Sequence, residues 1–192
     1  MSQPGPAKAS ARERIIEAAT ELFYAQGLRA ISADKIIERV GITKVTFYRH
    51  FRTKDDLVVA YLERRAELER TDVVATLARA DGDVDEAIRL LAENVGAVSC
   101  APGFRGCPFI NAAAEYTNPD HPVRQAVAVH RRWFKAVLEE MIAPLGLSEP
   151  TSTADQLVLL RDGAMVSGYL GDPATVSRSL HRAARAVISS HA

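Results

Sequence analysis

Cysteine and long hydrophobic runs are scarce in this sequence. Only Cys100 and Cys107 occur among 192 residues, too few for a disulfide framework. No run of about 18 apolar residues is present, which argues against a transmembrane helix. Residues 1–14 contain no apolar stretch and carry charges at Arg12, Glu13 and Arg14, unlike a signal peptide. We therefore expect a cytoplasmic protein with no membrane partner.

Signatures of catalysis and metal binding are also missing. No two of the five histidines are four residues apart, and the two cysteines are separated too widely for a metal-binding pair. The sequence contains no His-Glu-x-x-His, Gly-x-Ser-x-Gly or phosphate-binding loop motif. It therefore predicts a protein that is not an enzyme and needs no metal or cofactor.

Charge is balanced overall but not along the chain. Residues 1–54 contain ten Lys/Arg and five Asp/Glu, whereas residues 55–192 contain fourteen and nineteen. A basic segment in a neutral protein favours a polyanionic partner for that segment. The excess is modest and also arises by chance, so charge alone leaves nucleic-acid binding open.

Helical patterns cover the chain, and no strand-like alternation is bounded by turns. Capping residues mark helix starts, and two of them, Ser10-x-x-Glu13 and Thr53-x-x-Asp56, form capping boxes. The nine expected helices span about 11–26, 33–40, 44–50, 54–79, 84–99, 106–116, 123–142, 154–170 and 173–190. In the fourth, we expect a core face of Leu57, Val58, Tyr61, Leu62 and Leu68. The predicted fold class is all-α.

Residues 32–51 form a helix-turn-helix pattern, with the turn at Gly41 and Ile42. The residues expected to lock the two helices together are Val40, Ile42, Val45, Phe47 and Phe51. Hydrogen-bond donors crowd the second helix, which in this motif enters the major groove of DNA. Paired short helices are common in proteins that bind no DNA, so the pattern alone is a moderate signal.

Two longer segments are more specific. They are Arg14-Ile-Ile-Glu-Ala-Ala-Thr-Glu-Leu-Phe-Tyr-Ala-Gln-Gly27 and Gly41-Ile-Thr-Lys-Val-Thr-Phe-Tyr-Arg-His-Phe-Arg-Thr-Lys54. Together they resemble the DNA-binding domain of the tetracycline-repressor (TetR) family, over about residues 10–60. The resemblance implies a homodimeric transcriptional regulator, most often a repressor, that a small effector releases from palindromic double-stranded operator DNA. It also implies a DNA-binding domain at 10–56 and a ligand-binding and dimerisation domain at 57–192. The Pro/Gly/Ala-rich composition of residues 4–9 predicts a mobile arm at 1–9.

The resemblance also assigns DNA contacts. Base contacts fall on Lys44, Val45, Tyr48 and Arg49, and phosphate contacts on Thr46, Tyr48, His50 and Lys54. The chemistry agrees, because an arginine can bind guanine with two hydrogen bonds and a valine can meet a thymine methyl. A lysine at a helix N-terminus adds charge where backbone N–H groups already favour a phosphate. The alternative for Lys44 and Arg49 is solvated surface charge.

In the TetR family the last two helices form the dimer surface, and small residues in the corresponding helices of this sequence fit that role. They are Gly163, Ala164 and Gly168 in one helix and Ala183, Ala184 and Ala186 in the other. The alternative is that alanine here reflects only helix propensity.

Effector contacts are predicted in and after the sixth helix. Cys107, Asn111 and Glu115 lie four residues apart along one helical stripe, as in some TetR-family members. They could line an effector site or tie the helix to its neighbours, and Cys107 could be a reactive sensor thiol or plain packing. Trp133 is a further candidate for the wall of an apolar site, or for the core. We expect the effector to be an apolar or aromatic small molecule.

Two other function classes remain open from the residues alone. One is an all-helical small-molecule carrier or enzyme, and the other a helical adaptor that binds protein. Either would leave the donor-rich face of residues 44–50 without a purpose. Salt-dependent, specific binding to a palindromic duplex would distinguish the regulator from both.

Overall fold

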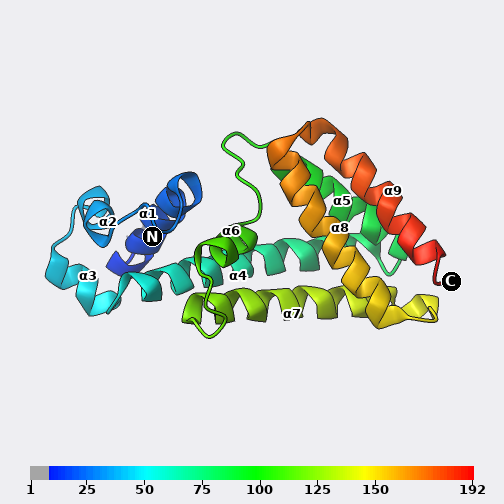
Figure 1. Ribbon diagram of the computed structural model, residues 1–192, viewed down its shortest axis with the longest axis horizontal. Coiled ribbons are helices and arrows are strands. Elements are labelled where there is room, and N and C mark those ends of the chain that lie inside the picture. The colour runs from blue at the N-terminus through cyan, green and yellow to red at the C-terminus, as the bar shows by residue number, and fades with distance from the viewer. Residues whose placement is uncertain (1–8) are drawn as a thin grey trace, which may run out of the picture.

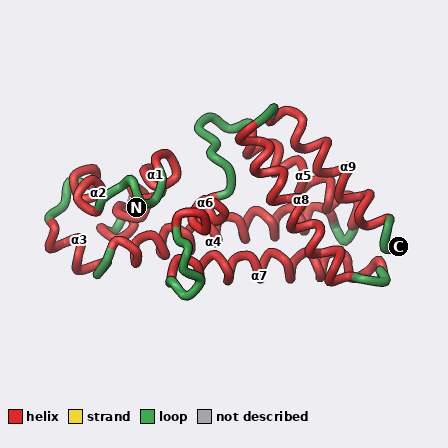
Figure 2. Tube along the Cα trace, in the orientation of Figure 1, coloured by secondary structure: helices red, strands yellow, loops and turns green. Residues whose placement is uncertain are grey.

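The computed structural model of the protein describes residues 9–192, and over that range it is built of helices and loops (Figure 2). The helices form two groups joined by one long helix, α4 (Figure 1). The all-α prediction is confirmed for the described residues. The predicted mobile arm at 1–9 lies, apart from residue 9, outside them.

The first group consists of α1 (Ala11–Gln26), α2 (Ala33–Val40) and α3 (Lys44–His50). The predicted box at the start of α1 is present: the Glu13 N–H donates to Ser10 Oγ, and the Ser10 N–H donates to Glu13 Oε2 at 2.7 Å. Gly41 ends α2 in the left-handed conformation, with φ 70°, which sets the tight turn into α3. Phe47 and Phe51 are buried, so α3 is held by its inner face.

Helix α4 (Lys54–Ala80) starts at a second capping box, formed by Thr53 and Asp56. The predicted core face is confirmed for Leu57, Val58, Tyr61 and Leu62, which are almost fully buried. It is wrong for the fifth residue of the set, Leu68, which is 42% exposed. That side chain lines a cavity that opens to the surface, which leaves it accessible to solvent.

The second group contains α5 (Val84–Ser99), α6 (Pro108–Glu115), α7 (Pro122–Ile142), α8 (Pro150–Leu170) and α9 (Val176–Ser189). Two short 3-10 turns, η1 (Ala143–Leu145) and η2 (Pro173–Thr175), precede α8 and α9. Three expected starts were wrong by two to four residues. Prolines at 108 and 150 occupy the first helical position, where a missing N–H costs nothing, and the proline at 173 begins a 3-10 turn instead of α9.

Two of the small residues in α8 and α9 pack inside the chain and do not face outward. A Cβ at Gly168 would lie 2.5 Å from Ser99 Oγ of α5, so only glycine fits there. Ala184 is buried in the core beside Leu157 of α8. Gly163, in contrast, faces open space. The small-residue pattern therefore mixes internal packing with surface.

No helix within residues 9–192 is long and apolar enough to cross a membrane.

Candidate functional site

The outer face of α3 is exposed, in keeping with a surface that reads another molecule. Tyr48 and Arg49 are exposed, and Val45 is 79% exposed. The expectation that Val45 locks the helix pair is therefore wrong. Phe47 and Phe51, four residues apart, take the inner face, so a residue two positions before Phe47 points outward.

Two of the predicted contact residues on α3 already have partners. Lys44 Nζ lies 2.8 Å from Asp34 Oδ1 of α2, and the hydrogen bond that the lysine donates to this carboxylate raises the pKa of the lysine. Both side chains are exposed, so the pair contributes little to stability. The Thr46 hydroxyl lies 3.0 Å from that of Thr43, the residue that caps α3. A ligand that bound the Lys44 ammonium would have to compete with Asp34.

His50 and Lys54 lie beside this face. The Nε2 atom of His50 is sealed from solvent without a hydrogen-bond partner in the described part of the chain, so a phosphate cannot reach that atom here. Lys54, at the start of α4, is half-buried and its Nζ lies 3.5 Å from the carbonyl oxygen of Arg29. That contact is long, and the ammonium remains available to an anion.

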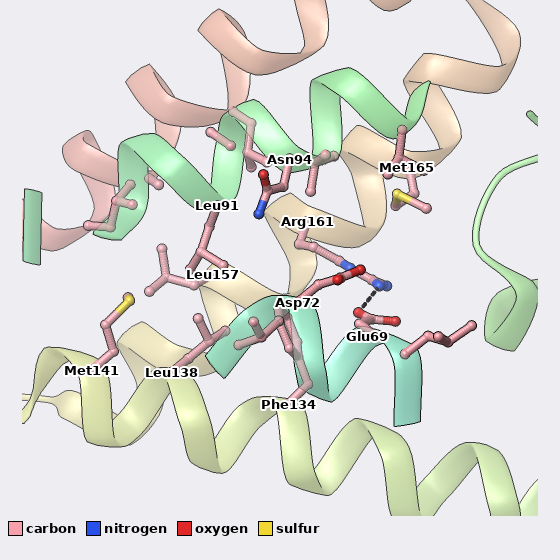
Figure 3. Close-up of a pocket in the computed structure, with 18 of the residues that line it drawn as sticks. Glu69, Asp72, Leu91, Asn94, Phe134, Leu138, Met141, Leu157, Arg161 and Met165 are labelled. Carbon is pink, nitrogen blue, oxygen red and sulfur yellow. Dashed lines mark hydrogen bonds and ion pairs between the residues drawn. The ribbon is translucent and has the colours of Figure 1, made fainter. Parts of the chain in front are cut away.

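Helix α4 and the second group of helices line a cavity of about 400 Å³ that opens to the surface, here called the large cavity (Figure 3). Its lining comes from α4 to α9 and is mostly aliphatic, with Phe134, Met141 and Met165 among the apolar side chains. The polar residues of its lining are Arg65, Glu69, Asp72, Asn94 and Arg161. The size and the few convergent polar groups are typical of a small-molecule site.

A partly buried ion pair spans the wall of the large cavity. Arg161 of α8 donates to Glu69 Oε1 of α4 at 2.6 Å (Figure 3). Its other terminal nitrogen lies 3.3 Å from Cys107 Sγ. Nε2 of the buried His130 lies 3.4 Å from Glu69 Oε2. Burial opposes ionisation of Glu69, but the hydrogen bond from His130 and the charge of Arg161 outweigh it and lower the pKa of this carboxyl. The pair ties α4, α7, α8 and the start of α6 together.

Helix α6 is clamped to the first group of helices. The carboxylate of Glu115 accepts one hydrogen bond from the Leu28 N–H at 2.9 Å and another from the Arg29 N–H at 2.7 Å. Arg29 Nε returns a bond to the Glu115 carbonyl oxygen at 2.8 Å. Gly27, with φ 95°, lies so near that an added Cβ would be 3.4 Å from the carboxylate. Both the positive φ and the close approach favour glycine at this turn.

A second set of bonds holds the loop before α6 to the same end of α1. The Tyr24 hydroxyl donates to the carbonyl oxygen of Gly106 at 2.9 Å and accepts from the Arg105 N–H at 3.0 Å. Arg105 Nη1 donates to the Ala25 carbonyl oxygen at 2.7 Å. A cation is well placed there, because the C-terminal carbonyl groups of a helix carry partial negative charge.

None of the four predicted effector residues lines the large cavity. Cys107 is buried as the N-cap of α6, outside the helix proper, against Arg161. Trp133 packs on His130 and Phe134. Asn111 and Glu115 line a different, smaller cavity. The alternative in which this stripe ties the helix to its neighbours accounts for the contacts of Glu115.

Residues of the large cavity that the sequence analysis missed include Glu69 and Arg161. Each is a charged residue within an otherwise buried helical stripe. Arg161 is four residues from both Leu157 and Met165, and Glu69 is four residues before Val73. A charge in such a stripe must be paired, and this signal was available without a structure.

The lowered pKa of Glu69 makes a prediction about acid stability. The stabilisation from the ionised carboxylate is complete above the ordinary glutamate pKa of about 4.3 and is lost as the pH falls through the lower folded value. Urea unfolding of the Glu69→Gln variant between pH 7 and pH 3 should therefore show lower stability at neutral pH and a flatter loss on acidification. Parallel pH profiles for the two proteins would contradict the assignment.

Comparison with known proteins agrees with this architecture. The family model described as "Bacterial regulatory proteins, tetR family" matches residues 15–61, which span α1 to the start of α4. The crystal structure of SCO4454, a TetR-family transcriptional regulator from Streptomyces coelicolor, is 39% identical with a TM-score of 0.88, covering 94% of this chain and 95% of that one.

A regulator from Streptomyces avermitilis is 28% identical with a TM-score of 0.78, over 93% of this chain and 98% of the other. The HTH-type transcriptional regulator LmrA of Bacillus subtilis is 29% identical over 159 residues, 82% of each protein. The exposed α3 face, the helix order and these relatives lead to one conclusion. The chain belongs to the TetR family of DNA-binding transcriptional regulators.

Proposed function

We propose that the protein is a repressor that binds a palindromic operator as a homodimer and is released by a small effector in the large cavity. Residues 10–56 are the DNA-binding domain and residues 57–192 the effector and dimer domain. The observation that carries the proposal is that one helix serves both sites. Helix α4 begins just after α3 (Figure 1), and further along it lines the large cavity.

The DNA-reading surface in this proposal is the outer face of α3 with the start of α4. Lys44, Val45, Tyr48 and Arg49 meet bases, and Thr46, Tyr48, His50 and Lys54 meet phosphates. The exposure of Val45 and Arg49 supports their assignment as base contacts. His50 takes part through Nδ1, because its Nε2 is sealed.

The dimer surface in this proposal is an exposed stripe of α8 together with α9. Leu159 and Leu170 are 68% and 75% exposed, and Val166 between them is also exposed. With Gly163, they lie at spacings of four, three and four residues, along one side of the helix. Exposed leucines in such a row favour burial against a second copy of the chain.

Two elements join the large cavity to the DNA-binding domain. One is α4, and the other is α6, whose first residue, Pro108, lines the large cavity while Glu115 binds the loop after α1. An effector can change operator affinity only by binding two arrangements of the protein unequally. An effector that moves α4 or α6 therefore changes the separation of the two α3 helices in the dimer.

Base and phosphate contacts should respond differently to substitution. Arg49→Ala is expected to weaken binding to the preferred operator by about 1–3 kcal/mol and to relax base preference. Lys54→Ala should weaken binding to all sequences alike and flatten the log–log salt dependence by about 0.9 for each phosphate that the protein no longer neutralises. Fluorescence anisotropy at several salt concentrations measures both, with Arg79→Ala, a cation at the far end of α4, as control. A change of base preference in Lys54→Ala would contradict these roles.

The dimer surface is testable by charge insertion. Leu159→Glu and Leu170→Glu should raise the dimer Kd by at least about tenfold, because a buried unpaired carboxylate costs several kcal/mol. Val74→Glu, at an exposed apolar site on α4, is the matched control and should leave the dimer intact. Analytical ultracentrifugation gives the Kd, and the wild-type dimer should contact half-sites about 34–36 Å apart or a multiple of it. Equal effects of all three changes would rule out this surface.

Effector release is testable with a variant that fills the large cavity. Apolar and aromatic compounds that raise the melting temperature of the wild type should also weaken its operator binding. Val98→Phe places a ring at the exposed rim of the large cavity and should abolish both effects while leaving operator binding intact. Compounds that stabilise the protein but never change operator binding would contradict the coupling.

A further inference from the structure

A second cavity, here called the small cavity, lies where the two groups of helices meet. Its volume is about 250 Å³. Phe23, Tyr24 and Leu28 line it from the first group, and Tyr169 lines it from the end of α8. Its polar lining includes Asn111 and Glu115 of α6, two residues that the sequence marked as effector contacts. Aromatic rings thus surround a space with a few polar groups.

The hydroxyl of Tyr61 has no hydrogen-bond partner among residues 9–192. Tyr61 lines the small cavity and is only 2% exposed, yet none of the hydrogen bonds found within residues 9–192 involves its hydroxyl. The unpartnered polar atoms that are sealed from solvent belong to other side chains, of His50, Arg65 and His130. Because the Tyr61 hydroxyl is not among them, it keeps a little accessible surface, and we place that surface in the small cavity, which Tyr61 lines. A ligand atom there would satisfy it.

The other polar groups define what such a ligand presents. Asn111 Nδ2 donates to the Arg105 carbonyl oxygen at 2.8 Å, which leaves the amide oxygen as an acceptor. Glu115 uses one lone pair of each carboxylate oxygen on a backbone N–H and keeps further acceptor capacity. The open sites on Asn111 and Glu115 are therefore acceptors and call for a ligand with an O–H or N–H donor. The Tyr61 hydroxyl and the remaining N–H groups of Arg105 can in turn donate to an oxygen of the ligand.

Charge on the ligand is disfavoured from both sides. The Glu115 carboxylate and the Arg105 guanidinium, whose centre lies 6.0 Å from the Tyr169 ring, give the lining one charge of each sign. Attraction to one of them is opposed by repulsion from the other, so a charged ligand gains little for the hydration that it loses on entry. An apolar cavity of about 150 Å³ is enough to hold benzene, so the small cavity has room for one ring with a small substituent. The volume of the small cavity, its aromatic walls and its free acceptors all favour a small neutral aromatic molecule with a hydrogen-bond donor.

We propose that the small cavity binds a neutral single-ring phenol, distinct from the effector of the large cavity. The ring lies among the aromatic side chains, its O–H donates to Asn111 or Glu115, and its oxygen accepts from the Tyr61 hydroxyl. Because both groups of helices line the site, occupancy adds contacts that this arrangement of the two domains alone provides. The effect on operator binding rests on the proposed function, whereas the binding itself does not.

The hydroxyl contact is tested with two fluorinated probes on the full chain. In ¹⁹F NMR titrations, 4-fluorophenol should bind with a Kd on the order of 1 mM, as expected for so small a ligand. The matched probe 4-fluorotoluene, which has no hydroxyl, should bind more weakly. Tyr61→Phe should weaken 4-fluorophenol by about three- to tenfold, the loss of one neutral hydrogen bond, and leave 4-fluorotoluene unchanged. Absence of 4-fluorophenol binding, or equal loss for both probes, overturns the proposal.

The location of the probe is tested by filling each cavity from its rim. Ala114 lines the small cavity and is exposed, so Ala114→Phe adds a ring there without disturbing a core. It should abolish 4-fluorophenol binding, whereas Val98→Phe, which fills the large cavity, should retain it. The reverse result places the phenol in the large cavity and overturns the proposal. Circular dichroism melting curves check that each variant folds.

The two proposals fail separately in this design. A protein that binds 4-fluorophenol in the small cavity but binds no duplex DNA would overturn the repressor function and support the phenol site. A protein that binds operator DNA and releases it with effectors of the large cavity, but ignores 4-fluorophenol, would overturn only the phenol site.

Discussion

The continuity of α4 is the constraint on which both halves of the molecule depend. Residues 54–80 contain neither glycine nor proline, so the helix has no built-in hinge over its 27 residues, about 40 Å. Near its start, Leu57 and Val58 complete the core beneath α3, and further on Glu69 and Val73 line the large cavity. Helix α4 is thus part of both cores, so a displacement of α4 in one core also displaces it in the other.

The DNA-binding domain is attached to the rest of the protein at a second place besides α4, through α6. One helix could act as a pivot about which the DNA-binding domain rotates. The bonds from Glu115 to the loop after α1 remove that freedom, and Tyr116 adds a further one, since its hydroxyl donates to Asp55 of α4 at 2.7 Å. The orientation of α3 is therefore determined by the relative positions of α4 and α6, both of which contribute walls to the large cavity.

Local signals in the sequence predicted local structure well. The capping box of Ser10 and Glu13 and the left-handed turn at Gly41 depend on residues within one helical turn, so their chemistry can be recognised from spacing alone. Whether Val45 points into the core or outward could not be predicted in this way, because a valine on a two-turn helix can either pack in the core or contact a ligand. Only the positions of the phenylalanines on α3, once seen buried, decide between them.

The candidate site was harder to predict because it is assembled from distant segments. The polar residues of the large cavity come from α4, α5 and α8, and no spacing rule relates them. Glu115 was identified as notable, but its partners are backbone N–H groups, which have no residue-type signature. The TetR resemblance supplied the architecture of the second half, whereas its exact helix starts were set by prolines at 108 and 150.

The bond between Glu115 and Leu28 also has a consequence for the order of events during synthesis. These residues are 87 positions apart, so the bond closes a long chain segment. A ribosome adds about 5–20 residues each second, so α1 to α3 emerge several seconds before α6 exists. During that interval, the first three helices and the start of α4 have most of their own core but no clamp. The nascent DNA-binding domain thus passes through an undocked period that ends only when the chain beyond residue 115 leaves the ribosome.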